Sequence, residues 1–232
     1  MSVSVILQQL AGGFGKTLLI FCLTLAFSLP LGLLVCLGRM SRWAPFRTRA
    51  LPTGRLSRFR PIQLIFKLLI SILRGTPLML QLLAVCYGPY YLFHAKLTAN
   101  WTFIALILGF VINYAAYFAE IYRGGIESMP VGQYEAAEVL GYTKVQTFGK
   151  IILPQVVKRI LPAVTNEVIT LVKDTSMAFV LAYAEMFTLA KQIAAAKTTF
   201  MPLFVAGVFY FVFNGIVAYA MEFLEKKLAY YR

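Results

Sequence analysis

Two otherwise apolar segments of this chain each carry a stripe of polar side chains at helical spacing. The stripe in segment 161–183 consists of Asn166, Glu167, Thr170, Lys173 and Asp174. The stripe that runs along segment 97–119 and one residue past its end consists of Asn113, Tyr117 and Glu120. A charge near the middle of a bilayer costs about 2.5–3.5 kcal/mol on insertion scales, so charges kept there usually serve a function. The stripes therefore predict a polar pathway that offers a ligand both a cation and carboxylate acceptors.

Structural pairing is the alternative interpretation of the charged members. Lys173 and Asp174 are adjacent, and the spacing leaves open whether they touch a ligand, neutralise each other or pair at a subunit contact. Glu120 and Arg123 stand at i and i+3, which favours a structural ion pair. Weaker candidates for the lining of the pathway are Thr76 and Gln81.

The segments that must position these stripes are long enough to cross a membrane. Only 13% of the 232 residues are charged, about half the share in a soluble domain. Runs without Asp, Glu, Lys or Arg, each long enough to cross a bilayer as a helix, are Thr17–Gly38, Gly75–Phe93, Leu97–Ala119 and Thr198–Met221. Segment 161–183, with its polar stripe, brings the number of spans to five and is the fourth of them in chain order. We predict an all-α, polytopic membrane protein with one transmembrane domain over 1–232, because only helices and closed barrels satisfy the backbone in lipid and these runs do not alternate.

The basic residues predict how the chain is oriented. With five spans, segments 39–61, 123–159 and 226–232 share one side and hold 15 of the 22 Lys and Arg residues. The opposite side holds Lys16, Lys96, Lys191 and Lys197. The positive-inside rule then puts the N-terminus outside and the C-terminus in the cytoplasm. The net charge of +13 therefore reflects topology in a cytoplasmic membrane rather than nucleic-acid binding.

Seven arginines crowd the first cytoplasmic loop, residues 39–60, with no acidic residue among them. Such a loop faces anionic membrane lipid. Its further role is left open. The segment Ile62–Leu73 that follows is apolar but carries Lys67, so we expect an interfacial or cytoplasmic extension of the second helix, with a kink at Pro77.

Segment 130–154, outside the predicted spans, contains residues that typically start and end helices. Pro130 suits a first helical turn, and Ser128 just before it is a possible cap. A short helix over Gln133–Leu140 would end at Gly141, a natural left-handed stop.

A second short helix follows in the same segment. Thr143 and Gln146 have the spacing of a capping box, and Pro154 is expected to end this helix. Two short helices cannot bury a core alone, so we expect this hairpin to dock on a partner protein.

The same hairpin carries a motif with fixed spacing. Its defined positions are Glu135-Ala136-Ala137, Gly141 and Ile151-Ile152-Leu153-Pro154. They resemble the cytoplasmic coupling loop of ABC-importer permeases, which docks on the ATPase subunit. Stretches that resemble the polar amino-acid uptake family within that class are 74–78, 116–126, 161–163, 166–167 and 173–176. The resemblance covers about residues 14–228, and segment 44–60 departs from it as an apparent insertion.

The resemblance implies a type I ABC importer permease that moves a polar or charged amino acid into the cell. An amino-acid zwitterion needs a cation for its carboxylate and an acceptor for its ammonium group, which the stripes supply. The implied partners are an ABC ATPase, an extracytoplasmic amino-acid-binding protein and a second permease chain, identical or homologous. The coupling residues would be Glu135, Ala136, Ala137, Gly141, Leu153 and Pro154.

Catalysis by the chain itself is not expected. Gly15-Lys16-Thr17 could end a phosphate-binding loop, but Leu10 stands where that loop needs glycine. We find no metal-ligand spacing and no catalytic set around the single histidine, so ATP and Mg²⁺ belong to the partner ATPase. The rival classes are an ion-gradient-driven carrier, which usually has internal repeats, and a non-transporting membrane scaffold.

Overall fold

The computed structural model describes residues 3–45 and 59–228, and every regular element in those ranges is helical. Arg47, Arg49, Arg55 and Arg58 of the predicted basic loop lie outside them, as does most of the expected insertion. The elements are α1 (Val3–Arg39), α2 (Pro61–Gly75), α3 (Leu78–Phe93), α4 (Ala99–Glu127), α5 (Val131–Val139), α6 (Lys144–Gln146), the π-helical η2 (Thr147–Ile152), α7 (Leu153–Asp174), the 3₁₀-helical η3 (Thr175–Leu181), α8 (Met186–Lys197) and α9 (Met201–Leu228).

Three helices of the described chain, α1, α4 and α9, are each long and apolar enough to cross a membrane. Two bent pairs raise the number to as many as five: α2 with α3, and the stretch Lys144–Leu181 with α8. The all-helical, polytopic fold class predicted from the charge-free runs is therefore confirmed. The first span's helix begins at Val3 rather than near residue 17.

The second predicted span is broken rather than kinked. The axes of α2 and α3 differ by 111°, and the chain between them is extended at Thr76 and Pro77. Proline lacks an amide hydrogen and disfavours helical backbone at the residue before it. The apolar segment expected to extend the second helix is thus a separate helix, α2.

The fourth predicted span also ends early. Helix α7 stops at Asp174, a 3₁₀ segment follows, and Ala182 then takes a left-handed conformation with φ of 53°. Helix α8 occupies 186–197, where the sequence suggested a loop at 191–197. The 55° bend between these parts turns the chain before it enters α9.

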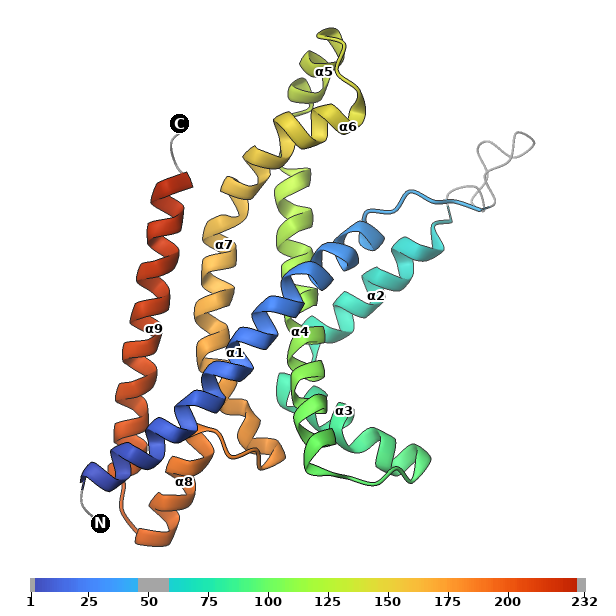
Figure 1. Ribbon diagram of the computed structural model, residues 1–232. Helices are drawn as coiled ribbons and strands as arrows, with labels where there is room; N and C mark the ends of the chain where they lie inside the picture. The colour runs from blue at the N-terminus through green and yellow to red at the C-terminus, as the bar shows by residue number, and fades with distance from the viewer. Residues whose placement is uncertain (1–2, 46–58, 229–232) are drawn as a thin grey trace.

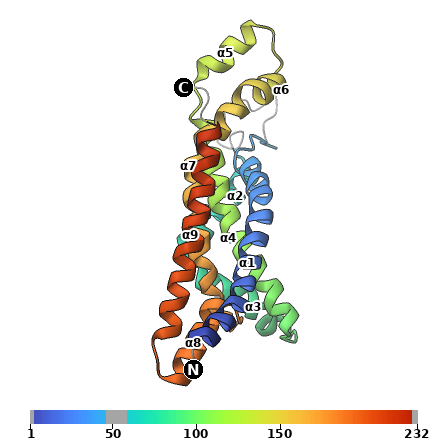
Figure 2. The same ribbon diagram turned by 60° about the vertical axis from the view of Figure 1, so that its left-hand side comes forward.

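Helix α4 lies in the middle of the molecule, and α1 crosses it diagonally (Figures 1 and 2). The crossing is close because Gly32 has no side chain: a Cβ there would lie 2.8 Å from the Cβ of Phe118. The two ends of the chain lie at opposite ends of the molecule in both views. The hairpin of α5 and α6 projects at the end where the chain finishes (Figure 1).

A buried carboxylate ties three elements together at the other end. Glu185 is fully buried and caps α8 by accepting hydrogen bonds from the backbone amides of Phe187 and Thr188, both at 2.7 Å. The hydroxyls of Thr17 on α1 and Tyr210 on α9 donate to it, both at 3.2 Å. These donors replace the hydration that a buried charge loses.

Replacing Glu185 with alanine is expected to lower the stability of the folded chain by about 3 kcal/mol or more, because each orphaned buried donor costs about 1–3 kcal/mol. The thermal unfolding midpoint of the detergent-purified protein measures the loss. The matched control is Glu222→Gln, which alters an exposed carboxylate paired with Lys226. Equal midpoints for the two variants would show that the Glu185 network adds nothing to stability.

Candidate functional site

A cavity of about 180 Å³ lies beside the break between α2 and α3. Its lining comes from that break, from the middle of α4 and from the last turns of α7. The lining residues are Thr76, Leu78, Asn113, Tyr114, Tyr117, Glu167, Thr170 and Asp174. The cavity therefore joins both predicted stripes, although they lie about 50 residues apart in the sequence.

One carboxylate of the cavity is held by a tyrosine. The hydroxyl of Tyr114 on α4 donates to Asp174 on α7 at 2.8 Å, and Tyr114 itself is 2% exposed. In the described chain Lys173 forms no ion pair with Asp174 within 4.0 Å, and its side chain is exposed. The hydrogen bond from Tyr114 thus orients the Asp174 carboxylate, which can still accept hydrogen bonds from a ligand.

The helix break is held by a small amide network. Gln81 donates from Nε2 to the Thr76 hydroxyl at 2.8 Å and to the Leu73 carbonyl at 2.7 Å. Asn113 on α4 donates to the side-chain oxygen of Gln81 at 3.0 Å. Thr76 and Gln81, the weaker candidates from the sequence, therefore shape the cavity from its α2–α3 side.

The break also places a helix N-terminus beside the cavity. Helix α3 begins at Leu78, a lining residue, and no described side chain caps it. The first amides of a helix have no intrahelical acceptor, and the helix dipole adds positive potential there. The N-terminus of α3 and the carboxylate residues Glu167 and Asp174 thus border the same cavity.

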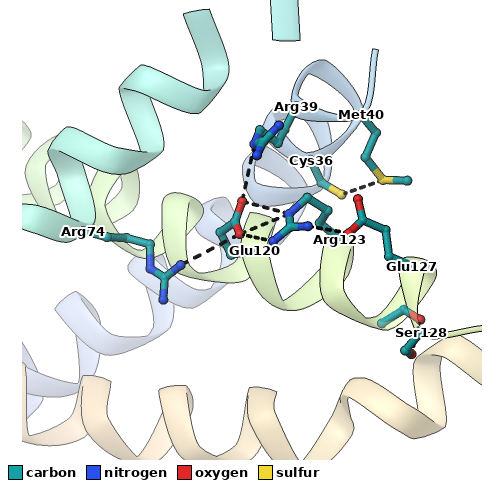
Figure 3. Close-up of polar contacts among 9 residues, drawn as sticks. Cys36, Arg39, Met40, Arg74, Glu120, Arg123, Glu127 and Ser128 are labelled. Atoms are coloured by element: carbon teal, nitrogen blue, oxygen red, sulfur yellow. Dashed lines mark hydrogen bonds and ion pairs between the residues drawn. The ribbon is translucent and has the colours of Figure 1, made fainter. Parts of the chain in front are cut away.

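Three members of the predicted stripes lie outside this lining. They are Asn166, Lys173 and Glu120, the last of which lies one helical turn past Tyr117. Glu120 stands among three arginines (Figure 3): Arg123 at 2.6 Å, Arg39 at 3.8 Å and Arg74 at 4.0 Å. Arg123 also pairs with Glu127 at 2.5 Å. The predicted pairing of Glu120 with Arg123 is therefore present, with two further cations that the spacing could not reveal.

A second cavity of about 470 Å³ adjoins this cluster. It shares Tyr117 with the first cavity, and the guanidinium of Arg74 lies 5.2 Å from the centre of the Tyr117 ring. The lining residues are Arg39, Lys67, Ile70, Ser71, Arg74, Gly75, Tyr117 and Glu120. The two cavities therefore share Tyr117 as a common lining residue.

Two lining residues, Tyr114 and Leu78, were not among the predicted pathway residues. Tyr114 precedes Tyr117 by three positions and so lies on the same α4 stripe, a signal that was available. Leu78 gave no signal, because only the backbone break brings it to the cavity. For Asp174, the sequence left open a pairing with Lys173, whereas the structure supplies a tyrosine as its hydrogen-bond partner.

In the hairpin of α5 and α6, some of the residues predicted to start or end helices do so. Gly141 has a left-handed φ of 77°, and Thr143 with Gln146 forms a capping box, so both predictions are confirmed. Ser128 does not cap α5. It ends α4 and donates its hydroxyl to the Gly125 carbonyl at 2.7 Å.

Pro154 does not end the second helix of the hairpin. Helix α6 passes through the π-helical turn of η2 directly into α7, and Pro154 lies in the first turn of α7. Helical hydrogen bonding continues up to the proline, because the Leu153 amide donates to the Phe148 carbonyl in the π-helical pattern. The hairpin is therefore a rigid extension of α7, the helix that carries Glu167 and Asp174.

The predicted coupling residues differ in accessibility. Glu135, Ala136, Gly141, Leu153 and Pro154 are exposed, whereas Ala137 is buried against the rest of the hairpin. Ala137, although predicted as a coupling residue, therefore offers no exposed side chain to a partner. Large exposed apolar side chains on the hairpin are Val131, Val139, Leu140 and Val145, with exposures of 69%, 88%, 73% and 83%. This apolar patch is typical of a protein interface.

Broken helices around a polar cavity, joined to an exposed apolar hairpin, define a membrane permease that works with a partner protein. Residues 50–230 match the family described as "Binding-protein-dependent transport system inner membrane component". The chain belongs to this family.

Individual relatives agree with this membership. The chain is 31% identical to the L-cystine transport system permease protein TcyB of Bacillus subtilis over 96% of this chain and 87% of the relative. It is 33% identical to the arginine transport system permease protein ArtQ of the same organism, over 75% and 78% of the two chains.

Solved structures agree as well. A crystal structure of an amino acid ABC transporter with histidines matches with a TM-score of 0.81 and 30% identity, over 98% of this chain and all of that one. Inward-facing structures of the MetNI methionine ABC transporter share the fold at 16–17% identity, with TM-scores of 0.67 and 0.73.

Proposed function

We propose that this chain is the membrane-spanning subunit of an ATP-driven importer and that it carries an amino acid through the cavity beside the α2–α3 break. The observation that carries the proposal is the polarity of that cavity. The N-terminus of α3 borders it at Leu78, and the carboxylate residues Glu167 and Asp174 also line it. A zwitterion needs this pair of opposite partners.

The substrate's ammonium group would bind Asp174 and Glu167, and its carboxylate would bind the first amides of α3. Interrupted helices use their N-terminal ends in this way in other transporters. Asn113, Tyr117 and Thr170 would line the path between the two charged ends. Lys173 and Glu120 would act outside the cavity, Lys173 at the exposed surface and Glu120 in the arginine cluster.

The exposed hairpin would seat on a separate ABC ATPase, which binds ATP and Mg²⁺. Because η2 runs without a break into α7, movement of the hairpin would reach Asp174 as a lever. A second permease chain would complete the pathway, and an extracytoplasmic binding protein would deliver the amino acid. These relatives are named as permease proteins of transport systems or of an ABC transporter, and their names support the proposed partners.

Reconstitution tests the function as a whole. The chain is co-expressed and purified with the ATPase and binding protein of its transport system, and amino-acid uptake into proteoliposomes is measured with and without ATP. We expect ATP-dependent uptake. Uptake driven by an ion gradient without ATP would favour a secondary carrier, and failure to purify with any ATPase would favour a scaffold.

The proposed orientation places the hairpin and the C-terminus in the cytoplasm and the N-terminus outside. In a Cys22→Ser background, which removes the exposed native thiol, we expect Lys197→Cys to react with an impermeant thiol reagent in intact cells. Val145→Cys, on the hairpin, should react only after the cells are opened. Labelling of Val145→Cys alone in intact cells would invert the orientation.

A further inference from the structure

The larger cavity has more positive charge than its own carboxylate can balance. Three basic side chains line it, Arg39, Lys67 and Arg74, against the single carboxylate of Glu120. The closest partner of Glu120 is Arg123, from outside the lining, at 2.6 Å. Arg39 and Arg74 stand farther away, at 3.8 and 4.0 Å. Lys67 forms no ion pair in the described chain and is exposed.

The basic side chains of α2 form one stripe. Lys67, Ser71 and Arg74 recur at i, i+4 and i+7 and all line the cavity. Helix α2 packs closely against α1 through Phe66. The ring of Phe66 lies so near Gly38 of α1 that a Cβ built on Gly38 would be 2.3 Å from a ring carbon. The stripe is therefore held in place on a docked helix.

An exposed apolar surface borders the same stripe. The large apolar residues of α2 with exposures of 39–62% are Leu64, Ile65, Leu68, Leu69 and Ile72. Leu64 precedes Lys67 by three positions, and Leu68 precedes Ser71 by three, so each leucine is a neighbour of a stripe residue on the helix surface. A basic pocket next to an apolar helix surface has two parts, one for an anion and one for hydrocarbon.

We propose that this pocket binds the headgroup of one anionic phospholipid of the cytoplasmic leaflet, whose acyl chains lie along α2. The phosphate would meet Lys67, Ser71 and Arg74, and basic pockets on the cytoplasmic side of membrane helices suit such headgroups. The inference rests on the proposed orientation. It places the lipid beside Tyr117, at the boundary with the substrate cavity, so the lipid would set the position of Arg74 over that ring.

The test measures thermal unfolding of the purified transporter complex, without ATP or amino acid, against the concentration of dihexanoyl phosphatidylglycerol. A ligand that binds the folded state raises the unfolding midpoint. We expect a saturable rise with this lipid and none with dihexanoyl phosphatidylcholine or inorganic phosphate. In Lys67→Gln the apparent affinity should fall about fivefold, and further in Lys67→Gln/Arg74→Gln.

The matched control is Lys226→Gln/Lys227→Gln, which removes two charges from the same side on α9 and should keep the full affinity. An equal rise with inorganic phosphate would overturn the lipid assignment in favour of a soluble anion. Equal affinity in Lys67→Gln and the parent would overturn the site. Dissociation of the second permease chain in the double variant, seen by light scattering, would show a subunit interface instead. None of these readings depends on transport, so failure of the proposed function is recognised separately.

Discussion

Replacing Gly141 with asparagine or aspartate is expected to abolish transport while the chain stays folded in the membrane. Gly141 turns the chain between α5 and α6 with a φ of 77°, a conformation that asparagine and aspartate adopt more readily than other residues with a side chain. A Cβ at this position would meet no atom of the chain within 4 Å. The new side chain is therefore tolerated by the chain itself and would project toward whatever the hairpin contacts.

Comparison of two variants separates a clash with the partner from local strain. Alanine at position 141 strains the left-handed backbone by about 1–2 kcal/mol, and asparagine by less. If the added side chain blocks the ATPase groove, Gly141→Asn and Gly141→Asp lose both co-purification of the ATPase and ATP-driven uptake. If strain alone matters, Gly141→Ala is the worst of the three. Normal uptake by a well-expressed Gly141→Asp variant would refute the docking role.

The fold class was predictable because lipid leaves a chain few options. Charge-free runs of about 20 residues must become helices, and the positions of α1, α4 and α9 follow from them. The two broken spans were not predictable from hydropathy. The break at Pro77 and the early end of α7 at Asp174 depend on local backbone geometry, which hydropathy averages away. The capping of α8 depends on Glu185, whose hydroxyl partners Thr17 and Tyr210 come from distant parts of the sequence.

The candidate site was predictable as two stripes but not as one cavity. Spacing puts Asn113 and Tyr117 on one face of a helix, and Thr170 and Asp174 on one face of another. It does not say which faces meet, because that depends on how α4 and α7 pack. It also cannot choose between neighbours in sequence: Lys173 and Asp174 are adjacent, yet they point to different surroundings.

Asp174→Asn is expected to leave the chain folded and to reduce uptake severely. The amide is nearly isosteric with the carboxylate, and its oxygen can still accept the hydrogen bond from the Tyr114 hydroxyl, now 2.8 Å away. The substitution does not leave Lys173 as an unpaired buried charge, because Lys173 is exposed and lies outside ion-pair distance of Asp174. The substrate's ammonium group, however, loses a charged acceptor.

The expected size of the loss follows from the energy of such a contact. Removing one partner of a hydrogen-bonded charge pair costs about 2–5 kcal/mol, which corresponds to a fall in uptake of about 30- to 4,000-fold at limiting substrate. Uptake into proteoliposomes at equal protein content measures it. The matched control is Glu225→Gln, an acid-to-amide change on α9 whose carboxylate accepts a hydrogen bond from Thr165 on α7 but lines neither cavity. That control should transport normally.

The alternative role of Asp174, to balance Lys173, gives the opposite result. Breaking a buried ion pair leaves an uncompensated charge and costs about 3–5 kcal/mol, so expression of Asp174→Asn would fall. In that case Lys173→Met/Asp174→Asn would restore both expression and transport, since no charge remains to balance. If Asp174 binds the ammonium group, the double variant stays folded and inactive, because the acceptor is still missing. A stable single variant with unchanged uptake would contradict both roles and remove Asp174 from the site.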